Sequence, residues 1–592
     1  MAIEAEGAAA TVPPAAPTPP VAATERTGRA GQSSSRRTRS AAPPRWDPSR
    51  PSSAIDRYAW AFFLASVCLG VGVLLWSSAR PYAQWPKTSD DMFYYFTLVR
   101  ESVRHGVVSS EGLRPTNGFH PLYFLVLRAV YPLVPESALP GMALAILAIA
   151  HGATCLALWA TLRNLAGRAL AGCVAGLYAA SPYVLGVVFA GVETALACLF
   201  VSLCLWAHGR WLFGGSRSDR IKALAALGLA VAARTDTVML AAALALGPAR
   251  GLWRRPAVAF RAVDRAPLAV ALLPVLAFGL WSQWATGEFL QTSGRSLSFW
   301  QSVGDWRIIR GALDGLGALA SPVAVLAYVL YVGVQLIAWL GKAPVVLLSS
   351  HPLGSMLVGA GIAARLGTDS VGEASATSSR GAALRRRLAG ELGAFLVLIW
   401  TFYALLFRHC QAWYWHTSVL ATALLLGLWL APLRQYADRA RAWLTRLPRG
   451  APALALLVAV GLSGLALDDL RPRGSPRAAE STVTTTNDPL AMVPDGAQLG
   501  AFDTGRLAWE HPRLRVVNLD GLVNNAAYRA LRRRSIGRYM LEQDVEWLYV
   551  YDKVVDRFAP FGLGEWLAQA EAVGRSASGV VLYRLRDSIA LR

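Results

Sequence analysis

Long apolar runs alternate with short polar segments over most of this chain. The clearest runs cover 58–78, 139–162, 169–189, 267–284, 392–407, 417–433 and 451–467, with a further run that ends near residue 212. Each can cross a hydrocarbon core about 30 Å thick, and in lipid such a run has to be helical because a helix satisfies its own backbone hydrogen bonds. The pattern predicts about ten or eleven spans, and it leaves the topology of 312–364 open.

Composition supports a membrane protein and argues against a nucleic-acid partner. Of the 592 residues, 54% are hydrophobic and 16% are charged, whereas soluble proteins carry about 25% charged residues. The net charge of +21 comes largely from Arg and Lys in short loops between apolar runs, as expected of cytoplasmic loops. No basic stripe interleaved with base-stacking aromatic residues occurs on a soluble segment.

The chain divides into three parts by composition. Residues 1–57, rich in Ala, Pro, Ser and Arg, predict a disordered cytoplasmic tail. Residues 58–469 form the membrane domain. Residues 470–592 contain charges, turn signals and strand-like runs at 514–519, 545–551 and 579–583, with a helix expected over 528–543. This α/β domain is predicted to lie outside the cytoplasm because the basic loop 434–450 precedes one last span.

One apolar segment, 223–248, is interrupted by Arg234-Thr235-Asp236. Both of its flanks are basic, so we expect both to be cytoplasmic and the segment to fold back as two half-helices with the charges near the tip. A charge at membrane depth costs about 2.5–3.5 kcal/mol, and pairing of Arg234 with Asp236 would reduce that cost.

Acidic residues on the predicted outer side are the first candidates for chemistry. Asp90 and Asp91 follow the first span, where a carboxylate can act as a general base, and repulsion within the pair can raise one pKa. The alternative is that Ser89 or Asp90 only caps the following helix. Glu193, in an otherwise apolar turn, is either a functional acid or a solvated turn carboxylate.

Further candidates lie on the same side. Asn117 and His120 belong to the run Thr116-Asn117-Gly118-Phe119-His120-Pro121, which either binds substrate or only starts an interfacial helix. Arg295, Arg408 and His416 could hold a phosphate or diphosphate, although Arg408 could simply snorkel at the interface. No Walker loop, Cys-x-x-Cys or His-Glu-x-x-His occurs, so the sequence alone supports no metal site, and the metal requirement stays open.

The order of several motifs resembles the GT-C superfamily of integral membrane glycosyltransferases. The motifs are Asp90-Asp91, Phe93-Tyr94-Tyr95, the run from Thr116 to Leu122, Gly191-Val192-Glu193-Thr194, Arg234-Thr235-Asp236 and the run from Val517 to Asn524. The branch that they resemble includes protein O-mannosyltransferases and aminoarabinose transferases acting on lipid A.

The resemblance implies sugar transfer from a polyprenyl-phosphate carrier on the outer membrane face. It implies Asp90 as the general base, with Asp91 adjacent to the acceptor or to the base, and Glu193 as a partner in acceptor or donor binding. The family pattern also has a basic residue after a Pro-Thr-Ser-like segment. Residues 291–295 fit this pattern only loosely, so the resemblance gives weak support to Arg295 as the phosphate ligand.

The predicted function is therefore inverting transfer of a sugar to a glycan, lipid or protein acceptor at the outer face of the cytoplasmic membrane. The alternative is a transporter or flippase of lipid-linked sugars, which the broken helix with Arg234 and Asp236 supports. A third possibility is an assembly protein that uses its outer domain for binding. The identity of the sugar, the acceptor and the carrier length stay open.

Overall fold

The structure is a computed structural model that describes residues 54–247, 263–300, 302–303, 326, 330, 333, 376–407, 411–431, 489–577 and 579–586. Nearly all of the predicted tail and of segment 312–364 lies outside these residues. So do the predicted span 451–467, the loop 434–450 and Arg408.

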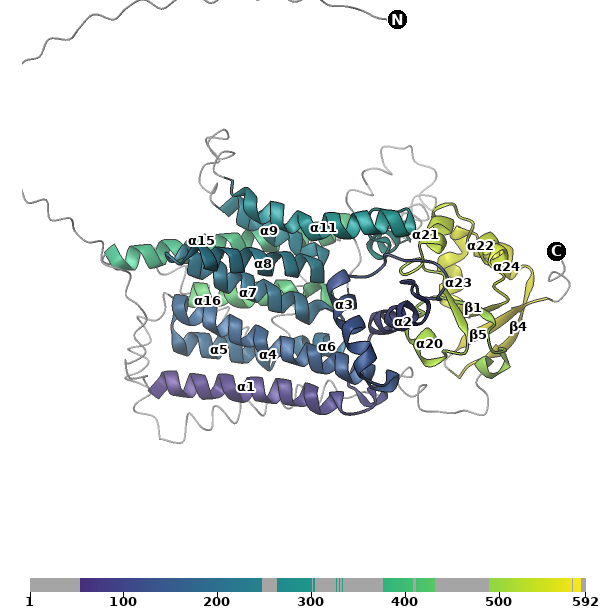
Figure 1. Cartoon of the computed structure of the whole chain (residues 1–592), viewed down its shortest axis with the longest axis horizontal. Helices are drawn as coiled ribbons and strands as arrows, with labels where there is room; N and C mark the ends of the chain where they lie inside the picture. Colours follow the sequence, from purple (N-terminus) through teal and green to yellow (C-terminus); the bar gives the residue numbers. More distant parts are fainter. Residues whose placement is uncertain are drawn as a thin grey trace, which may run out of the picture. The chain divides into compact units, whose positions relative to one another are not determined.

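Mostly apolar helices build the part of the described chain that precedes the C-terminal domain (Figure 1). They are α1 (Ala54–Ser78), α4 (Leu139–Ala166), α5 (Arg168–Ala179), α6 (Pro182–Phe189), α7 (Thr194–Leu212), α8 (Arg217–Ala233), α9 (Val238–Leu246), α11 (Arg265–Thr286), α15 (Ala376–Thr401) and α16 (His416–Leu430). Helices α1, α4, α7 and α11 are each long and apolar enough to cross a membrane, and α5 with α6, bent by 47°, makes a fifth candidate. Among the described residues this gives four or five candidate spans; the remaining predicted spans stay predictions.

The segment around Arg234 folds as a hairpin. Helix α8 ends at Ala233, a single 3₁₀ turn covers Thr235–Thr237, and α9 follows. Asp264, before α11, accepts a hydrogen bond from Arg220 near the start of α8 (3.0 Å) and donates its backbone N–H to Ala245 near the end of α9 (3.1 Å). The start of α8 and the end of α9, which lie away from the hairpin tip, therefore meet as predicted. That these two ends are cytoplasmic stays a prediction.

Two short helices lie between α1 and α4, namely α2 (Asp90–His105) and α3 (Pro121–Val130). Helix α2 is buried from Met92 to Ser102. Its apolar side chains pack with those of α3, α4, Trp509 and Val523 in one cluster. The last two residues belong to the C-terminal domain, so α2 is the element on which that domain sits (Figure 1).

The C-terminal domain is α/β, in agreement with the strand-like runs. Its sheet has the order β2-β1-β3-β5-β4, with the first three strands parallel and the last two antiparallel to their neighbours. The strands are β1 (Gln498–Ala501), β2 (Arg515–Asn518), β3 (Trp547–Tyr551), β4 (Ala570–Arg575) and β5 (Val580–Leu585). The helices are α20 (Gly505–Glu510), α21 (Asn525–Arg532), α22 (Ile536–Glu542), α23 (Asp552–Phe558) and α24 (Leu563–Leu567).

One detail of this domain differs from the prediction. The single helix expected over 528–543 is two helices, α21 and α22, separated near Arg534. Arg534 has a φ of 55°, in the left-handed region that ends a helix rather than continuing it. Hydrophobic periodicity alone did not reveal this break.

Candidate functional site

The acidic pair lies at the first turn of α2, where this helix meets the C-terminal domain. Ser89 is the residue that caps α2, because its side chain accepts a hydrogen bond from the Met92 N–H at 3.3 Å. Its hydroxyl also donates to the Ala190 carbonyl at 2.6 Å, which ties the helix start to the turn before α7. The capping function proposed for Ser89 or Asp90 is thus met by Ser89, and the Asp90 carboxylate is available for other contacts.

The Asp90 carboxylate binds the start of α20. Its Oδ2 accepts the Gly505 N–H at 2.9 Å and its Oδ1 accepts the Arg506 N–H at 2.8 Å. One turn along α2, the Tyr94 hydroxyl accepts the Thr504 N–H at 3.0 Å. These bonds fix the orientation of the carboxylate, and they make the C-terminal domain part of its immediate surroundings.

Two more carboxylates come from the C-terminal domain. Asp503 precedes α20, and Asp520 follows β2. The Asp503 N–H donates to Asp520 Oδ2 at 3.1 Å, and the Tyr94 hydroxyl donates to the same oxygen at 3.4 Å. Asp503 and Asp520 therefore join Asp90 and Asp91 in one acidic cluster, although more than 400 residues separate the two pairs in sequence.

The environment moves the pKa values of these acids apart. Burial, opposed by the two backbone hydrogen bonds, raises the pKa of Asp90 to about 6. Burial and the neighbouring charges of Asp90 and Glu193 raise the pKa of Asp91 well above its usual range. Burial and Asp503 raise the pKa of Asp520 to about 7. At neutral pH Asp90 is therefore mostly ionised, and the upward shift of the Asp91 pKa favours its protonated form; two acids whose pKa values are moved apart are typical of acid–base pairs.

Glu193 is buried, not a solvated turn residue. Its Oε1 lies 2.6 Å from Arg234 Nη1, and its Oε2 accepts a hydrogen bond from the Tyr95 hydroxyl at 2.9 Å. Arg234 also pairs with Asp236 at 2.9 Å, which confirms the predicted pairing at the hairpin tip. The Arg234 guanidinium further donates to the Tyr403 hydroxyl at 3.1 Å, so Glu193, Arg234 and Asp236 form one buried ion network.

His120 lies at the edge of this network. Its Nε2 is 3.7 Å from Glu193 Oε1, while its buried Nδ1 makes no hydrogen bond within the described part of the chain. Burial lowers the pKa of His120, even though Glu193 opposes the shift. Neutral His120 can thus accept or donate a hydrogen bond at this position.

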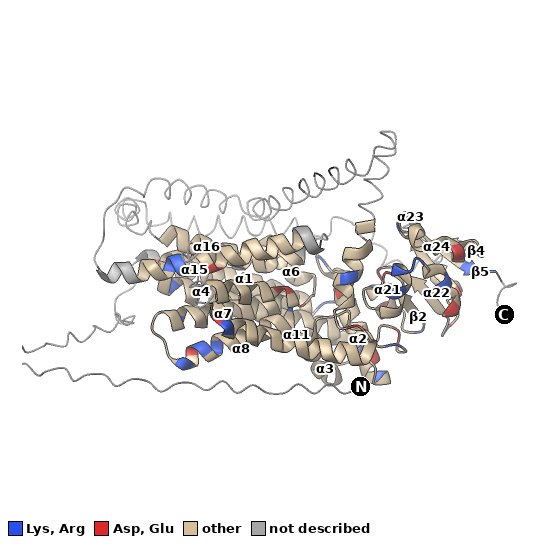
Figure 2. Ribbon diagram, turned by 90° about the horizontal axis from the view of Figure 1, so that it is seen from above, with Lys and Arg blue, Asp and Glu red and all other residues tan. Residues whose placement is uncertain are grey.

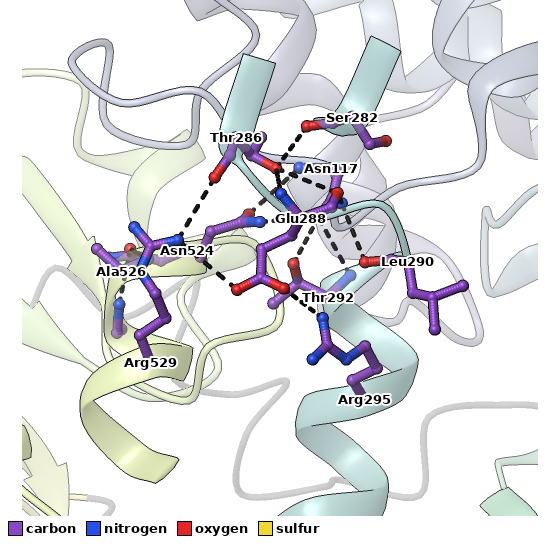
Figure 3. Close-up of polar contacts among 12 residues, drawn as sticks. Asn117, Ser282, Thr286, Glu288, Leu290, Thr292, Arg295, Asn524, Ala526 and Arg529 are labelled. Atoms are coloured by element: carbon purple, nitrogen blue, oxygen red, sulfur yellow. Dashed lines mark hydrogen bonds and ion pairs between the residues drawn. The ribbon is translucent and has the colours of Figure 1, made fainter. Parts of the chain in front are cut away.

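Asn117 is the centre of a hydrogen-bond cluster that joins three segments (Figure 3). Its Nδ2 donates to the Glu288 and Leu290 carbonyls at 3.0 and 3.1 Å, and its Oδ1 accepts from the Thr292 N–H and from Asn525 Nδ2 at 3.1 and 3.0 Å. Asn117 is fully buried. These bonds hold loop 116–118, the loop after α11 and the C-terminal domain together, which is a structural role for a residue that we expected to bind substrate.

Two residues predicted to bind phosphate, Arg295 and His416, lie outside the acidic cluster. Arg295 pairs with Glu288 at 2.5 Å (Figure 3), and its guanidinium lies over the Tyr528 ring. His416, the first residue of α16, is buried in the helical bundle, where its Nε2 is 2.9 Å from the Tyr178 hydroxyl. In the described residues neither makes a contact with the acidic cluster, and Arg408 lies outside those residues.

Sequence reasoning missed Arg506, whose backbone N–H binds Asp90. Its Nε pairs with Glu510 at 2.7 Å, whereas its Nη2 is buried without a hydrogen-bond partner within the described chain. Asp520 lies in the run from Val517 to Asn524 that carried the resemblance. Arg506 and Asp503 lie in no such motif, and only the docking of α20 on α2 brings them to Asp90.

The described residues contain no group of three or more His, Cys, Asp or Glu side chains arranged to hold a metal ion.

Comparison with known proteins gives the following similarities. A family described as a domain of unknown function (DUF8728) matches residues 481–585. No curated protein matches. Among solved structures, the chain is similar to the oligosaccharyltransferase AglB from Archaeoglobus fulgidus in complex with an inhibitory peptide and a dolichol-phosphate, at 14% identity over 90% of this chain and 75% of that one, with a TM-score of 0.44.

Two further solved structures are similar at the same level. An Archaeoglobus fulgidus oligosaccharyltransferase in complex with Zn and sulfate has 14% identity over 88% of this chain and 73% of that one, with a TM-score of 0.46. ArnT from Cupriavidus metallidurans bound to undecaprenyl phosphate has 15% identity over 89% of this chain and 98% of that one, with a TM-score of 0.38. Similarity this low does not assign an activity, which has to be inferred from the side chains described above.

Proposed function

We propose that this chain transfers a sugar from a polyprenyl-phosphate donor to a hydroxyl group of an acceptor, at the junction of α2 with the C-terminal domain. The observation that carries the proposal is the Asp90 carboxylate. It is partly exposed, oriented by two backbone N–H groups, and has a pKa raised to about 6. The donor class comes from the motif resemblance of the sequence.

Asp90 is suited to act as the general base. A carboxylate offers about four acceptor positions, and the bonds from Gly505 and Arg506 use one on each oxygen. A position remains for the acceptor hydroxyl. A pKa of about 6 leaves Asp90 ionised at pH 7 and still basic enough to take up a proton in the transition state.

Asp91 and Arg506 would serve the donor phosphate. A protonated Asp91 does not repel an anionic phosphate, and it can donate a hydrogen bond to the oxygen that leaves the anomeric carbon. Arg506, whose backbone N–H binds Asp90, has an Nη2 without a hydrogen-bond partner in the described chain, and this group would supply a cationic donor for the phosphate. The acceptor oxygen bonds to the anomeric carbon as the carbon–phosphate oxygen bond breaks, the hydroxyl proton goes to Asp90, and polyprenyl phosphate leaves. Direct displacement inverts the anomeric centre.

The buried ion network favours an enzyme over a transporter. A transport pathway needs ionisable groups that a substrate can reach near the middle of the membrane. Arg234 and Asp236 are at a break in a helix, as that alternative requires, but each is satisfied by the other, by Glu193 or by Tyr403. They therefore stabilise the hairpin tip beneath the proposed site.

The test compares Asp90→Asn with Asp91→Asn in proteoliposomes that contain a polyprenyl-phosphate sugar and an acceptor. Asp90→Asn is expected to lose at least about a hundredfold in transfer, because it removes the base. Its amide also turns an N–H donor toward Gly505 or Arg506, so hydrogen exchange of α20 must show that the domain stays docked. Parent-like turnover by a docked Asp90→Asn protein would eliminate Asp90 as the base. Movement of lipid-linked sugar between leaflets without transfer would establish the transporter instead.

A further inference from the structure

Helix α21 of the C-terminal domain has one buried face and one basic face. Ala527, Ala530 and Leu531 pack into the core of the domain. On the other side, the basic face consists of three exposed arginines with the helical spacing i, i+3 and i+4, namely Arg529, Arg532 and Arg533. In Figure 2 the ribbon at α21 carries blue segments, which mark its basic residues.

Among the described residues, Arg529 pairs with Glu288 at 3.9 Å, whereas Arg532 and Arg533 form no ion pair. From Asn525 to Leu541 the sequence has five arginines and no acidic residue. Arginines in the last turn of a helix interact favourably with its dipole. That effect is confined to the last turn, and it does not explain why Arg533 and Arg534 extend the basic run beyond the helix. A surface where positive charge exceeds negative charge in this way is suited to an anionic partner.

The end of α11 marks the level of the membrane surface. The most apolar stretch of helix α11 has a mean hydropathy of 1.6, and only 17% of that stretch is buried inside the protein. Leu273, Leu280 and Trp284 are 65%, 65% and 83% exposed along it. Exposed leucines on a span face lipid, and a tryptophan at the span end is typical of the interface between hydrocarbon and headgroups. The boundary therefore lies close to Trp284 and Thr286.

The basic face lies next to that boundary. Arg529 Nη1 donates to the Thr286 carbonyl at 3.4 Å and lies 3.9 Å from Glu288 Oε1 (Figure 3). Figure 1 also shows α21 beside the end of α11. Arg532 and Arg533 follow Arg529 within about one helical turn, so they lie near the same boundary.

We propose that the basic face of α21 binds the phosphate groups of anionic phospholipids in the leaflet where α11 ends. The partner is a lipid bilayer surface, because the face adjoins a membrane boundary. Arg529 is held by Thr286 and Glu288, and Arg532 and Arg533 reach out to the headgroups. The contact seats the C-terminal domain on the membrane, in addition to its docking on α2. This inference does not depend on the proposed sugar transfer.

The test measures lipid binding by the purified full-length protein in detergent, with a fluorescent phosphatidylglycerol as the probe and phosphatidylcholine as the neutral comparison. The variant is Arg532→Gln with Arg533→Gln, which leaves the contacts of Arg529 intact. The matched control is Arg515→Gln with Arg575→Gln, which removes two exposed arginines from strands β2 and β4. Each arginine at an anionic surface contributes about fivefold, or about 1 kcal/mol.

The α21 variant is expected to bind phosphatidylglycerol about 25-fold more weakly than the parent, and the control within about twofold. Arg532→Lys with Arg533→Lys should bind nearly as the parent, because the charges remain. Binding should weaken as salt is raised. Equal affinity of the α21 variant and the control overturns the proposal, as does equal affinity of the parent for phosphatidylcholine. Displacement of the probe by equimolar inorganic phosphate also overturns it, because the face would then be a site for free phosphate.

Discussion

The docking of the C-terminal domain on α2 can be tested at a single glycine, Gly505. A Cβ atom at this position would lie 2.2 Å from the Asp90 carbonyl oxygen, 3.0 Å from Asp90 Oδ2 and 3.0 Å from the Tyr94 nitrogen. Two of these atoms belong to the backbone of a buried helix and cannot move aside cheaply. Gly505→Ala therefore has to push α20 away from α2 and stretch both N–H bonds to Asp90.

The free-energy cost of Gly505→Ala to docking follows from overpacking and from the weakened hydrogen bonds to Asp90. Forcing a methyl group into a packed interface costs about 1–3 kcal/mol, and a hydrogen bond to a charged group contributes about 1.5–3 kcal/mol. Partial movement of the domain avoids part of both costs, and alanine loses less backbone entropy on folding by about 0.4–1 kcal/mol. A net loss of about 2 kcal/mol corresponds to about a 30-fold shift toward the undocked domain.

Hydrogen–deuterium exchange of the full-length protein measures this shift. The amides of Gly505's helix and of the first turn of α2 should exchange about 30-fold faster in Gly505→Ala. Gly564→Ala is the matched control, because it lies in helix α24 of the same domain and its added Cβ meets no atom within 4 Å. Sugar transfer should fall in Gly505→Ala although every carboxylate is retained. Parent-like exchange together with parent-like transfer would refute the reasoning that the docked domain orients Asp90.

Three further predictions concern acid–base chemistry, the ion network and sidedness. Transfer should fall about tenfold per pH unit below pH 6, because the raised pKa of Asp90 means that the base is protonated below about 6 and ionised above it; a pH–rate profile that stays flat down to pH 5 would contradict this. Arg234→Gln should lower the free energy of unfolding by about 3–5 kcal/mol, since it leaves Glu193 and Asp236 buried without their cation. Thermal unfolding measures this loss, and Arg210→Gln is the control because the Arg210 side chain is half exposed. Cysteines placed at Ser216 and Ala249 should both be labelled from the cytoplasmic side, and labelling from opposite sides would refute the hairpin. A C-terminal reporter that fluoresces only in the cytoplasm should stay dark, and a bright intact fusion would overturn the assigned sidedness of the second half of the chain.

The two parts of the molecule contribute different groups to the proposed site. Helix α2 supplies Asp90 and Asp91, and the C-terminal domain supplies Asp503, Asp520 and Arg506. The proposed base, Asp90, comes from α2, and the backbone N–H groups that orient it come from the C-terminal domain. Docking is therefore a condition for the chemistry that we propose, and variants that separate the two parts should lose transfer without a change in any acidic residue.

The sequence by itself determined the features that depend on local patterns. Apolar runs of span length indicated α1, α4, α7 and α11, and strand-like runs indicated the α/β domain. The basic flanks of 223–248 predicted the hairpin, and charge compensation at membrane depth predicted the Arg234–Asp236 pair. These inferences succeed because burial in lipid or in a domain core acts on consecutive residues with a regular period.

Only the tertiary structure decided which polar groups meet. The bond between Asp90 and Gly505 joins residues 415 positions apart, and the bond between Asn117 and Asn525 joins residues 408 positions apart. A buried polar side chain must find a partner somewhere, but its sequence neighbours do not identify that partner. The sequence therefore identified Asn117 as a candidate ligand, and the fold gave it a structural role. In the same way, Arg506 had no motif to mark it, and it became a candidate for phosphate binding only because α20 packs on α2.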